Sequence, residues 1–223
     1  MWRAGGATDA LAARRPGAHI PRMGTNDWKS AFGRPGRLAE GTLSGQLLIA
    51  MPNLQDPNFA GSVICLCAHS PGGAMGLILN KPIERLTFEA LLKQVDVTPL
   101  PPARQIRLLA GGPVEESRGF VLHSGEWQAE GSLAVAGGWG LTASVEILKA
   151  IASGGGPRRC LLALGYAGWE AGQLEAEIAQ NAWLSVEADE ELIFGEDSAT
   201  MWRRALAKLR VDPLLLSGAA GHA

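Results

Sequence analysis

Short apolar segments bounded by glycine or proline run through the chain from Leu43 onward. Residues 62–69 (SVICLCAH) and 74–80 (AMGLILN) have strand length and flank residues 70–73 (SPGG), whose composition is typical of a turn. They predict a hairpin, which Pro82 ends because proline cannot donate to a strand ladder. The 29 glycines among 223 residues are nearly twice ordinary usage and indicate many turns.

Helical patterns alternate irregularly with these strands. Residues 86–95 place their apolar side chains on one stripe, and Thr87 is a suitable N-cap. Further helices are predicted at 142–152, at 172–180 and after Asp197 or Ser198, and further strands at 106–109, 119–123, 132–136, 159–164, 183–186 and 192–194. Because strands and helices do not alternate regularly, the pattern predicts an α+β fold in a single compact domain.

The charge of the chain is divided unevenly. Residues 1–40 carry seven basic and three acidic groups, and the rest carries the remaining 13 of 20 basic and 19 of 22 acidic groups. A segment of net charge +4 therefore precedes a body of −6, which opposes sequence-independent binding to nucleic acid. Residues 1–43 show no periodicity, and we expect a disordered basic extension before a domain at 44–223.

The three cysteines, Cys65, Cys67 and Cys160, bear on the compartment. The number of cysteines is odd, and the first forty residues lack the apolar segment of a secretory signal. Both observations predict that the protein is located in the reducing cytoplasm. No apolar run reaches the ~18 residues that a membrane helix needs, so no membrane partner is expected.

Strand alternation would place Cys65, Cys67 and His69 on one face of the 62–69 strand. We expect no metal there, because Cys65 and His69 would lie about 13 Å apart and zinc ligands converge within about 2.0–2.3 Å of one ion. Cys65 and Cys67 are expected to be small core side chains that burial makes unreactive. The alternative is a reactive Cys67 with His69 or His123 as its base.

A cationic pocket is the second candidate site. Lys81, oriented by Asn80, follows a predicted strand, where polar groups can be presented on a rigid scaffold. The two glycines at 111–112 can expose consecutive N–H groups that bind an anion. The alternative at Lys81 is a solvated turn.

Four further residues would complete that pocket. Arg118 directly precedes the predicted 119–123 strand and His123 ends it; both would add cations if the hairpin of the 106–109 and 119–123 strands is a neighbour of the 62–80 hairpin. Tyr166 and Trp169 lie in a glycine-rich segment and would wall a cleft, the alternative being core packing. No cofactor is expected, because the glycines at 72–76 precede a strand, whereas a phosphate loop precedes a helix.

Six stretches of the chain resemble the YqgE/AlgH family of bacterial proteins. They are 47–63 (LLIAMPNLQDPNFAGSV), 67–82 (CAHSPGGAMGLILNKP), 111–123 (GGPVEESRGFVLH), 163–178 (ALGYAGWEAGQLEAEI), 181–184 (NAWL) and 221–223 (GHA). The resemblance implies a cytosolic α+β domain whose bifurcated, partly barrel-like sheet is surrounded by helices. Carried over by position, its candidate binding surface is Asp56, Asn58, Cys67, His69, Asn80, Lys81, Gly111, Gly112, Arg118, His123, Tyr166 and Trp169.

Three functions are compatible with these residues. We favour a non-enzymatic regulatory or ligand-sensing protein that acts through a small anion or a protein partner, because no catalytic signature is present. The second is direct DNA binding, since family members are often labelled transcriptional regulators; the acidic body opposes it, and no basic recognition helix is evident. The third is an enzyme that uses Cys67 or His123.

Removal of residues 1–40 should leave the fold intact, because this segment offers no apolar face to bury. A protein that begins near Leu43 should unfold within a few degrees of the full chain in a thermal melt. A larger loss would show that the segment packs against the domain.

Overall fold

The strands β2 (Val63–Ser70) and β3 (Gly73–Ile78) form the predicted hairpin. In this computed structural model, which describes residues 42–100, 104–212 and 216, β1 (Gln46–Ala50) pairs antiparallel with β2. The strand β9 (Trp183–Glu187) pairs with β1 and ends this side of the sheet. Of the expected basic extension, residues 1–41 lie outside the described residues.

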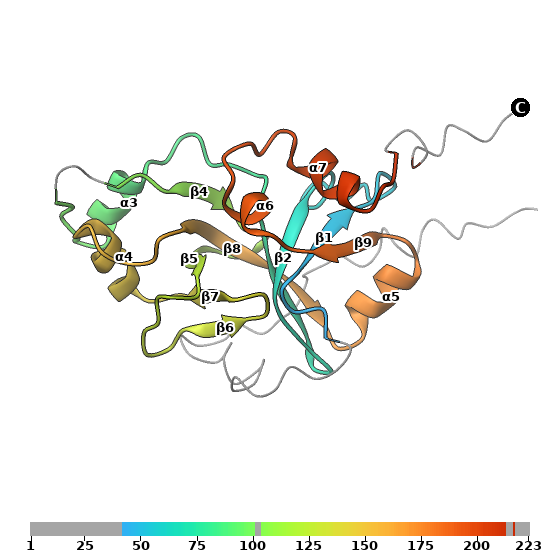
Figure 1. The fold of residues 1–223 in the computed structure, drawn as a ribbon, viewed down its shortest axis with the longest axis horizontal. Helices are drawn as coiled ribbons and strands as arrows, with labels where there is room; N and C mark the ends of the chain where they lie inside the picture. The colour runs from blue at the N-terminus through green and yellow to red at the C-terminus, as the bar shows by residue number, and fades with distance from the viewer. Residues whose placement is uncertain (1–41, 101–103, 213–215, 217–223) are drawn as a thin grey trace, which may run out of the picture.

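The strand β8 (Cys160–Glu170) divides the sheet. Its first half lies between β5 (Val114–Ser124), which runs antiparallel to it, and β4 (Arg107–Ala110), which runs parallel. Its second half pairs with β3, and β5 continues through β7 (Trp139–Thr142) to β6 (Leu133–Val135). The described strands follow the order β6-β7-β5-β8-β3-β2-β1-β9 with β4 as a branch, which is the bifurcation that the family resemblance implies (Figure 1).

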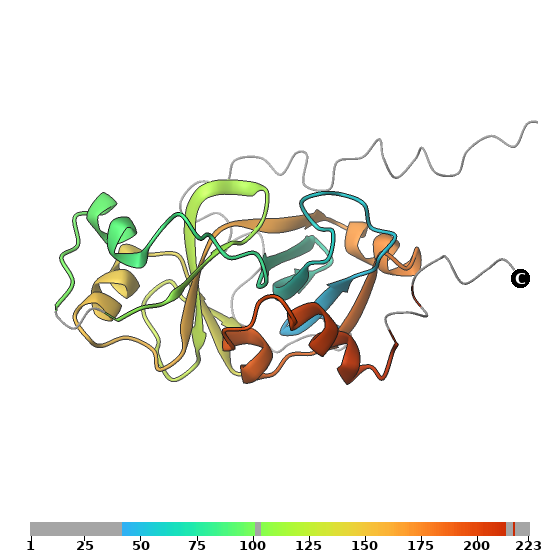
Figure 2. The ribbon, with the colours of Figure 1, turned by 90° about the horizontal axis from the view of Figure 1, so that it is seen from above.

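Five helices with described bounds surround this sheet. The helices α6 (Glu190–Phe194) and α7 (Met201–Lys208) pack on one face, and α5 (Gln173–Ala179) packs on the other. The helices α3 (Phe88–Gln94) and α4 (Val145–Ala152) lie side by side at the end of the molecule opposite α5 (Figure 1, Figure 2). The predicted α+β class is confirmed.

Side-chain alternation divides the core among these layers. In β1, Leu47 and Ile49 face the cluster under α6 and α7, whereas Leu48 and Ala50 face the cluster under α5. A third cluster fills the space between α3, α4 and the strands β4, β5 and β8. Both faces of the central strands are buried, which explains their continuous apolar runs. No described helix combines the length and apolarity needed to cross a bilayer.

Two predictions near helix ends are wrong. Residues 192–194, predicted as a strand, belong to α6, because Asp189 Oδ1 accepts the Leu192 N–H at 2.8 Å and caps a helical turn. The helix predicted from Thr142 begins at Val145, because Thr142 belongs to β7, a strand that the sequence does not reveal.

The predicted helix caps had different outcomes. Thr87 caps α3 as predicted, and its Oγ1 accepts the Ala90 N–H at 3.2 Å. The N-cap of α7 is Thr200 rather than Asp197 or Ser198. Asp197 Oδ1 accepts the Thr200 N–H at 3.0 Å, so Asp197 orders the turn before the helix.

The backbone of residues 111–112 packs directly on β8 where the sheet divides. A Cβ at Gly111 would lie 2.3 Å from the Gly165 carbonyl oxygen. A Cβ at Gly112, whose φ is +151°, would lie 2.2 Å from the Tyr166 carbonyl carbon. Gly165 has a φ of +71° and would clash with the Gly112 oxygen at 2.4 Å. These glycines allow two backbones to approach closely.

Gly111→Ala should destabilise the fold by roughly 1–3 kcal/mol, because the added Cβ meets backbone atoms that cannot rotate away. The measurement is the free energy of unfolding from urea denaturation. Gly119→Ala is the matched control, since its Cβ has Leu164 Cδ2 at 3.9 Å as its nearest neighbour. Equal losses in the two variants would contradict the close-approach explanation.

Candidate functional site

A cavity of about 490 Å³ lies between the helices α3 and α4 and the strands β5 and β8. Its floor comes from the sheet residues Val121, Leu162 and Leu164, because alternate side chains of β5 and β8 face the helices. Leu91 of α3 and Leu148 of α4 stand in its walls. The remaining lining residues are Leu86, Gln94, Val95, Glu115, Ser117, Arg118, Gly119, Ala143, Ser144 and Val145.

Small residues leave this space open. Gly119, Ala143 and Ser144 line the cavity at positions where larger side chains would occupy it. A concave, mostly apolar space with a few polar groups at its rim is the usual form of a small-molecule site. The arrangement suits a ligand with an apolar body and one polar end.

The rim is formed by an irregular start of β5. The pairing of β5 with β8 shifts between Val114 and Gly119, so the intervening residues bulge from the sheet. Within the bulge, Arg118 Nη1 donates to Glu115 Oε2 at 2.9 Å, and the two side chains are 18% and 20% exposed. The Arg118 guanidinium also lies 5.2 Å from the centre of the Phe120 ring.

Tyr166 stands behind this ion pair. Its side chain is buried and meets the Phe120 ring edge-to-face at 5.7 Å. Burial, with a smaller contribution from the Glu115 carboxylate, raises the pKa of Tyr166 to about 12. The phenol is therefore neutral at physiological pH. The structure thus brings together two of the predicted site residues, Arg118 and Tyr166, with Glu115.

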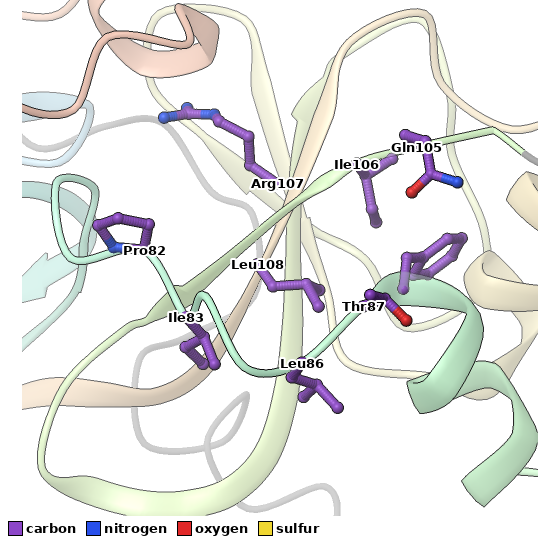
Figure 3. A pocket seen from close by; sticks show the side chains of 9 residues that line it. Pro82, Ile83, Leu86, Thr87, Gln105, Ile106, Arg107 and Leu108 are labelled. Carbon is purple, nitrogen blue, oxygen red and sulfur yellow. The ribbon is translucent and has the colours of Figure 1, made fainter.

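A smaller, more open groove of about 250 Å³ shares Leu86 with the cavity. Figure 3 shows Ile83, Leu86 and Leu108 around it. The Arg107 guanidinium points away from these side chains, and its Nη2 donates to the Ile193 carbonyl of α6 at 2.6 Å (Figure 3). Burial lowers the pKa of Arg107. Arg107 therefore ties β4 to α6, and the groove is lined by apolar side chains together with Thr87 and Gln105.

Asn80 and Lys81 hold the loop that precedes β2. Asn80 Oδ1 accepts the Val63 N–H at 2.9 Å, and Asn80 Nδ2 donates to the Gly61 carbonyl at 2.8 Å. Lys81 Nζ donates to the carbonyls of residues 57 and 58 at 3.0 and 2.8 Å. Both side chains therefore bind backbone groups of this loop, and Lys81 Nζ contacts two loop carbonyls instead of standing in a solvated turn or an anion site.

Asp56 and Asn58 belong to the same loop. Asp56 Oδ1 accepts the Asn58 N–H at 2.8 Å. Burial lowers the pKa of Lys81, and the Asp56 carboxylate opposes that shift. The contacts of Asp56, Asn58, Asn80 and Lys81 fix this loop to the end of β3.

A bulge in β2 separates Cys67 from His69. The pairing with β3 shifts between Leu66 and Ala68, and the extra residue reverses the alternation of side chains. Cys67 faces the α6–α7 cluster, whereas His69 reaches Glu175 of α5 on the other side. The prediction that the two side chains share one face is therefore wrong.

Cys67 is buried, with 1% of its surface exposed, and its Sγ lies 3.6 Å from the Cys65 carbonyl oxygen. The interaction with Cys65 and burial raise the pKa of Cys67 well above its ordinary value. His69 Nδ1 accepts the Leu43 N–H at 3.0 Å, and its Nε2 lies 2.7 Å from Glu175 Oε1. The imidazole therefore anchors the start of the domain.

His123 is buried completely and has a partner at each ring nitrogen. Nδ1 lies 3.0 Å from the Ser124 carbonyl oxygen, so it carries the proton, and Nε2 accepts from Thr142 Oγ1 at 3.0 Å. Thr142 Oγ1 in turn lies 2.7 Å from Ser132 Oγ. A Cβ at Gly140 would lie 2.3 Å from the ring, so this glycine makes room for it.

Trp169 belongs to an aromatic cluster under α5. It meets Trp183 edge-to-face at 5.9 Å and stacks near Phe59 at 6.4 Å. The indole nitrogens of Trp169 and Trp183 both donate to Glu177 Oε2, at 2.9 and 2.8 Å. Trp169 therefore packs in the core, which was the alternative to the predicted cleft wall.

The predicted cationic pocket does not assemble. Lys81 binds the loop, His123 is buried against Thr142 of β7, and the Gly111 N–H donates to the Leu164 carbonyl at 2.7 Å. Of these predicted groups, only Arg118 lines the cavity. Across the described ranges, no group of three or more His, Cys, Asp or Glu side chains could hold a metal ion.

Sequence reasoning missed Glu115, Ser117 and the apolar lining from α3 and α4. Glu115 could have been found from its position three residues before Arg118, because this spacing brings an acidic and a basic side chain together between the strands predicted at 106–109 and 119–123. The lining residues gave no such signal, because the same apolar stripes also predict an ordinary helix packed on a sheet.

Comparison with known proteins gives close relatives over most of the chain. The AlgH-like family model matches residues 47–214. A UPF0301 protein of Cereibacter sphaeroides is 51% identical over 182 residues, which cover 81% of this chain and 99% of that protein. A UPF0301 protein of Rhodospirillum rubrum is 48% identical over 184 residues, which cover 82% of this chain and 96% of that protein.

Two solved structures are also similar. The solution structure of the AlgH protein from Pseudomonas aeruginosa matches with a TM-score of 0.68 and 43% identity, covering 84% of this chain and 100% of that one. The crystal structure of a Corynebacterium diphtheriae protein, 20% identical, matches with a TM-score of 0.60 over 87% of this chain and 99% of that one, and shows a shared fold.

Cys67 should react slowly with a thiol reagent in the native protein near pH 7, because its thiol is buried and its raised pKa disfavours the reactive thiolate. Cys160 is half-buried and should be labelled first, although burial raises its pKa as well. Mass spectrometry after brief alkylation resolves the order. Rapid labelling of Cys67 ahead of Cys160 would favour a reactive cysteine.

His123 should make the fold less stable as pH falls below 6.5. Burial lowers its native pKa from 6.5, so the unfolded chain binds more protons between the two values. Each unit of difference between the native and unfolded pKa values lowers the free energy of unfolding by about 1.4 kcal/mol once the pH is below both values. Above pH 6.5 this stability is fully present. Urea unfolding at pH 7.5 and 5.5 should show a smaller loss for His123→Gln than for the natural chain; equal losses would contradict this role.

Proposed function

The chain belongs to the AlgH-like family, and we propose that it is a non-enzymatic regulatory protein that senses a small molecule in the cavity between α3, α4 and the sheet. The observation that carries the proposal is the cavity itself. Its volume of about 490 Å³ is in the range of ligand sites, and its lining is mostly apolar with polar groups at the rim.

The alternatives receive less support from the described residues. A nucleophile needs exposure and a lowered pKa, whereas Cys67 is buried and its pKa is raised. His123 is enclosed and uses both ring nitrogens within the fold. For DNA binding, the strongest basic helix is α7, where Arg204 pairs with Glu191 at 2.6 Å and Lys208 with Asp189 at 2.6 Å.

Arg204 and Lys208 therefore offer less charge to phosphates than the sequence of α7 indicates.

We propose a cytoplasmic location on the ground that Cys65, Cys67 and Cys160 are all free thiols, which suits a reducing compartment.

The probe 1-anilinonaphthalene-8-sulfonate, an aromatic body with one anionic end, tests the cavity. We expect a saturable rise in its fluorescence with one site per chain. Val145→Trp places an indole at the cavity wall and should weaken binding at least tenfold, because Val145 lines the space and is 37% exposed.

Leu100→Trp is the matched control, since Leu100 is 60% exposed and is not among the lining residues. It should bind the probe as the natural chain does. Binding that Val145→Trp leaves unchanged, or no saturable binding, would count against the cavity as a ligand site.

A further inference from the structure

Residues 42–45 form a short strap that runs along β2 before β1 begins. The strand β1 pairs with β2 as far as Cys65, and the strap covers the part of β2 that follows, where the bulge lies. Its hydrogen bonds to β2 carbonyls are Gly45 N–H to Leu66 at 2.7 Å, Ser44 Oγ to Cys67 at 3.2 Å and Thr42 Oγ1 to His69 at 3.2 Å. The strap therefore occupies an edge of the sheet that would otherwise be open to another strand.

The His69 side chain fastens this strap to α5. The Leu43 N–H donates to Nδ1 at 3.0 Å, and Nε2 lies 2.7 Å from Glu175 Oε1. Because Nδ1 accepts a hydrogen bond, the ring is neutral and carries its proton on Nε2, which donates to the carboxylate. The His69 side chain is 10% exposed and that of Glu175 is 52% exposed, so protons from solvent can reach the pair.

A second proton on this ring would change what the ring can bind. Imidazole is the side chain that ordinarily changes charge between pH 5 and 8, and the added proton goes to Nδ1 because Nε2 already carries one. Two donors, Nδ1–H and the Leu43 N–H, would then face each other, and their hydrogen bond is lost. The bond from Nε2 to Glu175 gains charge assistance in the same step and keeps the ring in place.

The ring has a carboxylate partner on α5. The backbone N–H of Glu175 and the hydrogen bond from His69 lower the pKa of that carboxyl, so it is ionised while the imidazole gains its proton. The other acidic residue of α5, Glu177, is held by the two indole nitrogens of the aromatic cluster. Glu175 is therefore the anion of α5 that keeps its grip on the ring.

The other described neighbours of the ring are uncharged or turned away. The strap residues 42–45 carry no titratable side chain, and Ala74 lies opposite His69 on β3. On β8, Trp169 faces α5, so alternation turns the carboxylate of Glu170 to the other face of the sheet. Protonation of the ring therefore acts on the Leu43 contact without a second charged neighbour among these elements.

We propose that His69 is a pH-sensitive latch on the strap: when the ring takes a second proton from solvent, it releases the Leu43 N–H and keeps its bond to Glu175. Release loosens residues 42–45 from β2 and opens the edge that they cover. Residues 1–40, which lead into the strap, carry seven basic and three acidic groups, so the latch couples pH to the attachment of a basic segment. This inference is independent of the cavity, which lies beside α3 and α4 at the end of the molecule opposite α5 (Figure 1).

Nuclear magnetic resonance of the full chain tests the starting state of the latch. Long-range ¹H–¹⁵N spectra at pH 7.5 should show the His69 ring neutral, with its proton on Nε2 and a bare Nδ1. A ring that is already charged at pH 7.5, or one that carries its proton on Nδ1, would overturn the proposal. This readout needs no variant to fold.

Hydrogen exchange of the Leu43 amide tests the release. His69→Asn is the matched variant, because an amide oxygen can accept the Leu43 N–H and does not titrate. Between pH 7.5 and 5.0, the protection factor of this amide should fall at least tenfold further in the natural chain than in His69→Asn, since local opening exposes it. Both chains keep His123, so a loss of stability of the whole fold affects them alike. Equal falls in the two chains would overturn the latch.

Two further variants separate the latch from ordinary contacts. Ser44→Ala removes a strap bond that does not titrate and should lower Leu43 protection by the same factor at both pH values. Glu175→Gln removes the charge that favours the protonated ring and should move the midpoint of the loss down by about half a pH unit. A midpoint that stays or rises in Glu175→Gln would contradict the proposal.

Discussion

The contact between the 111–112 backbone and β8 is the constraint on which the rest of the structure depends. Gly111 and Gly112 cross β8 at Gly165 and Tyr166 with no room for a Cβ on the crossing chain. This crossing carries the chain from β4 to β5 on the other side of β8, so the sheet divides there. The glycines that resembled an anion site are required by the topology instead.

The candidate site follows from that crossing. The chain enters β5 at Val114 and regains regular pairing only at Gly119, which leaves the Glu115–Arg118 pair as a bulge beside Tyr166. The same strands turn their outer side toward α3 and α4, where small lining residues leave a cavity. One topological feature therefore places a charged rim next to an apolar space.

Local patterns predicted the elements whose structure is set locally. The β2–β3 hairpin and the Thr87 cap of α3 need only neighbouring residues, and both are confirmed. The bulge in β2 that turns His69 to the opposite face, and the pairing of Thr142 in β7, depend on distant strands and were missed. The predicted cationic pocket also required distant strands to bring Lys81, Arg118 and His123 together, and they do not meet.

Residues such as Lys81 and Asn80 were identified by chemistry alone, and the fold uses that chemistry to hold a loop. Arg118 was predicted to belong to a cationic pocket with Lys81 and His123; it lines a different cavity, and neither that cavity nor its partner Glu115 could be derived from one strand's pattern. A residue type indicates what a side chain can bind; the tertiary structure decides whether the partner is the protein or a ligand.

The central claim is that the cavity between α3, α4 and the sheet is a ligand site. The most direct measurement is a crystal structure of the protein grown with 1-anilinonaphthalene-8-sulfonate. The account predicts that the aromatic body of the probe lies in this cavity against Val121, Leu148 and Leu162. A probe bound elsewhere, with this cavity unoccupied, would contradict it.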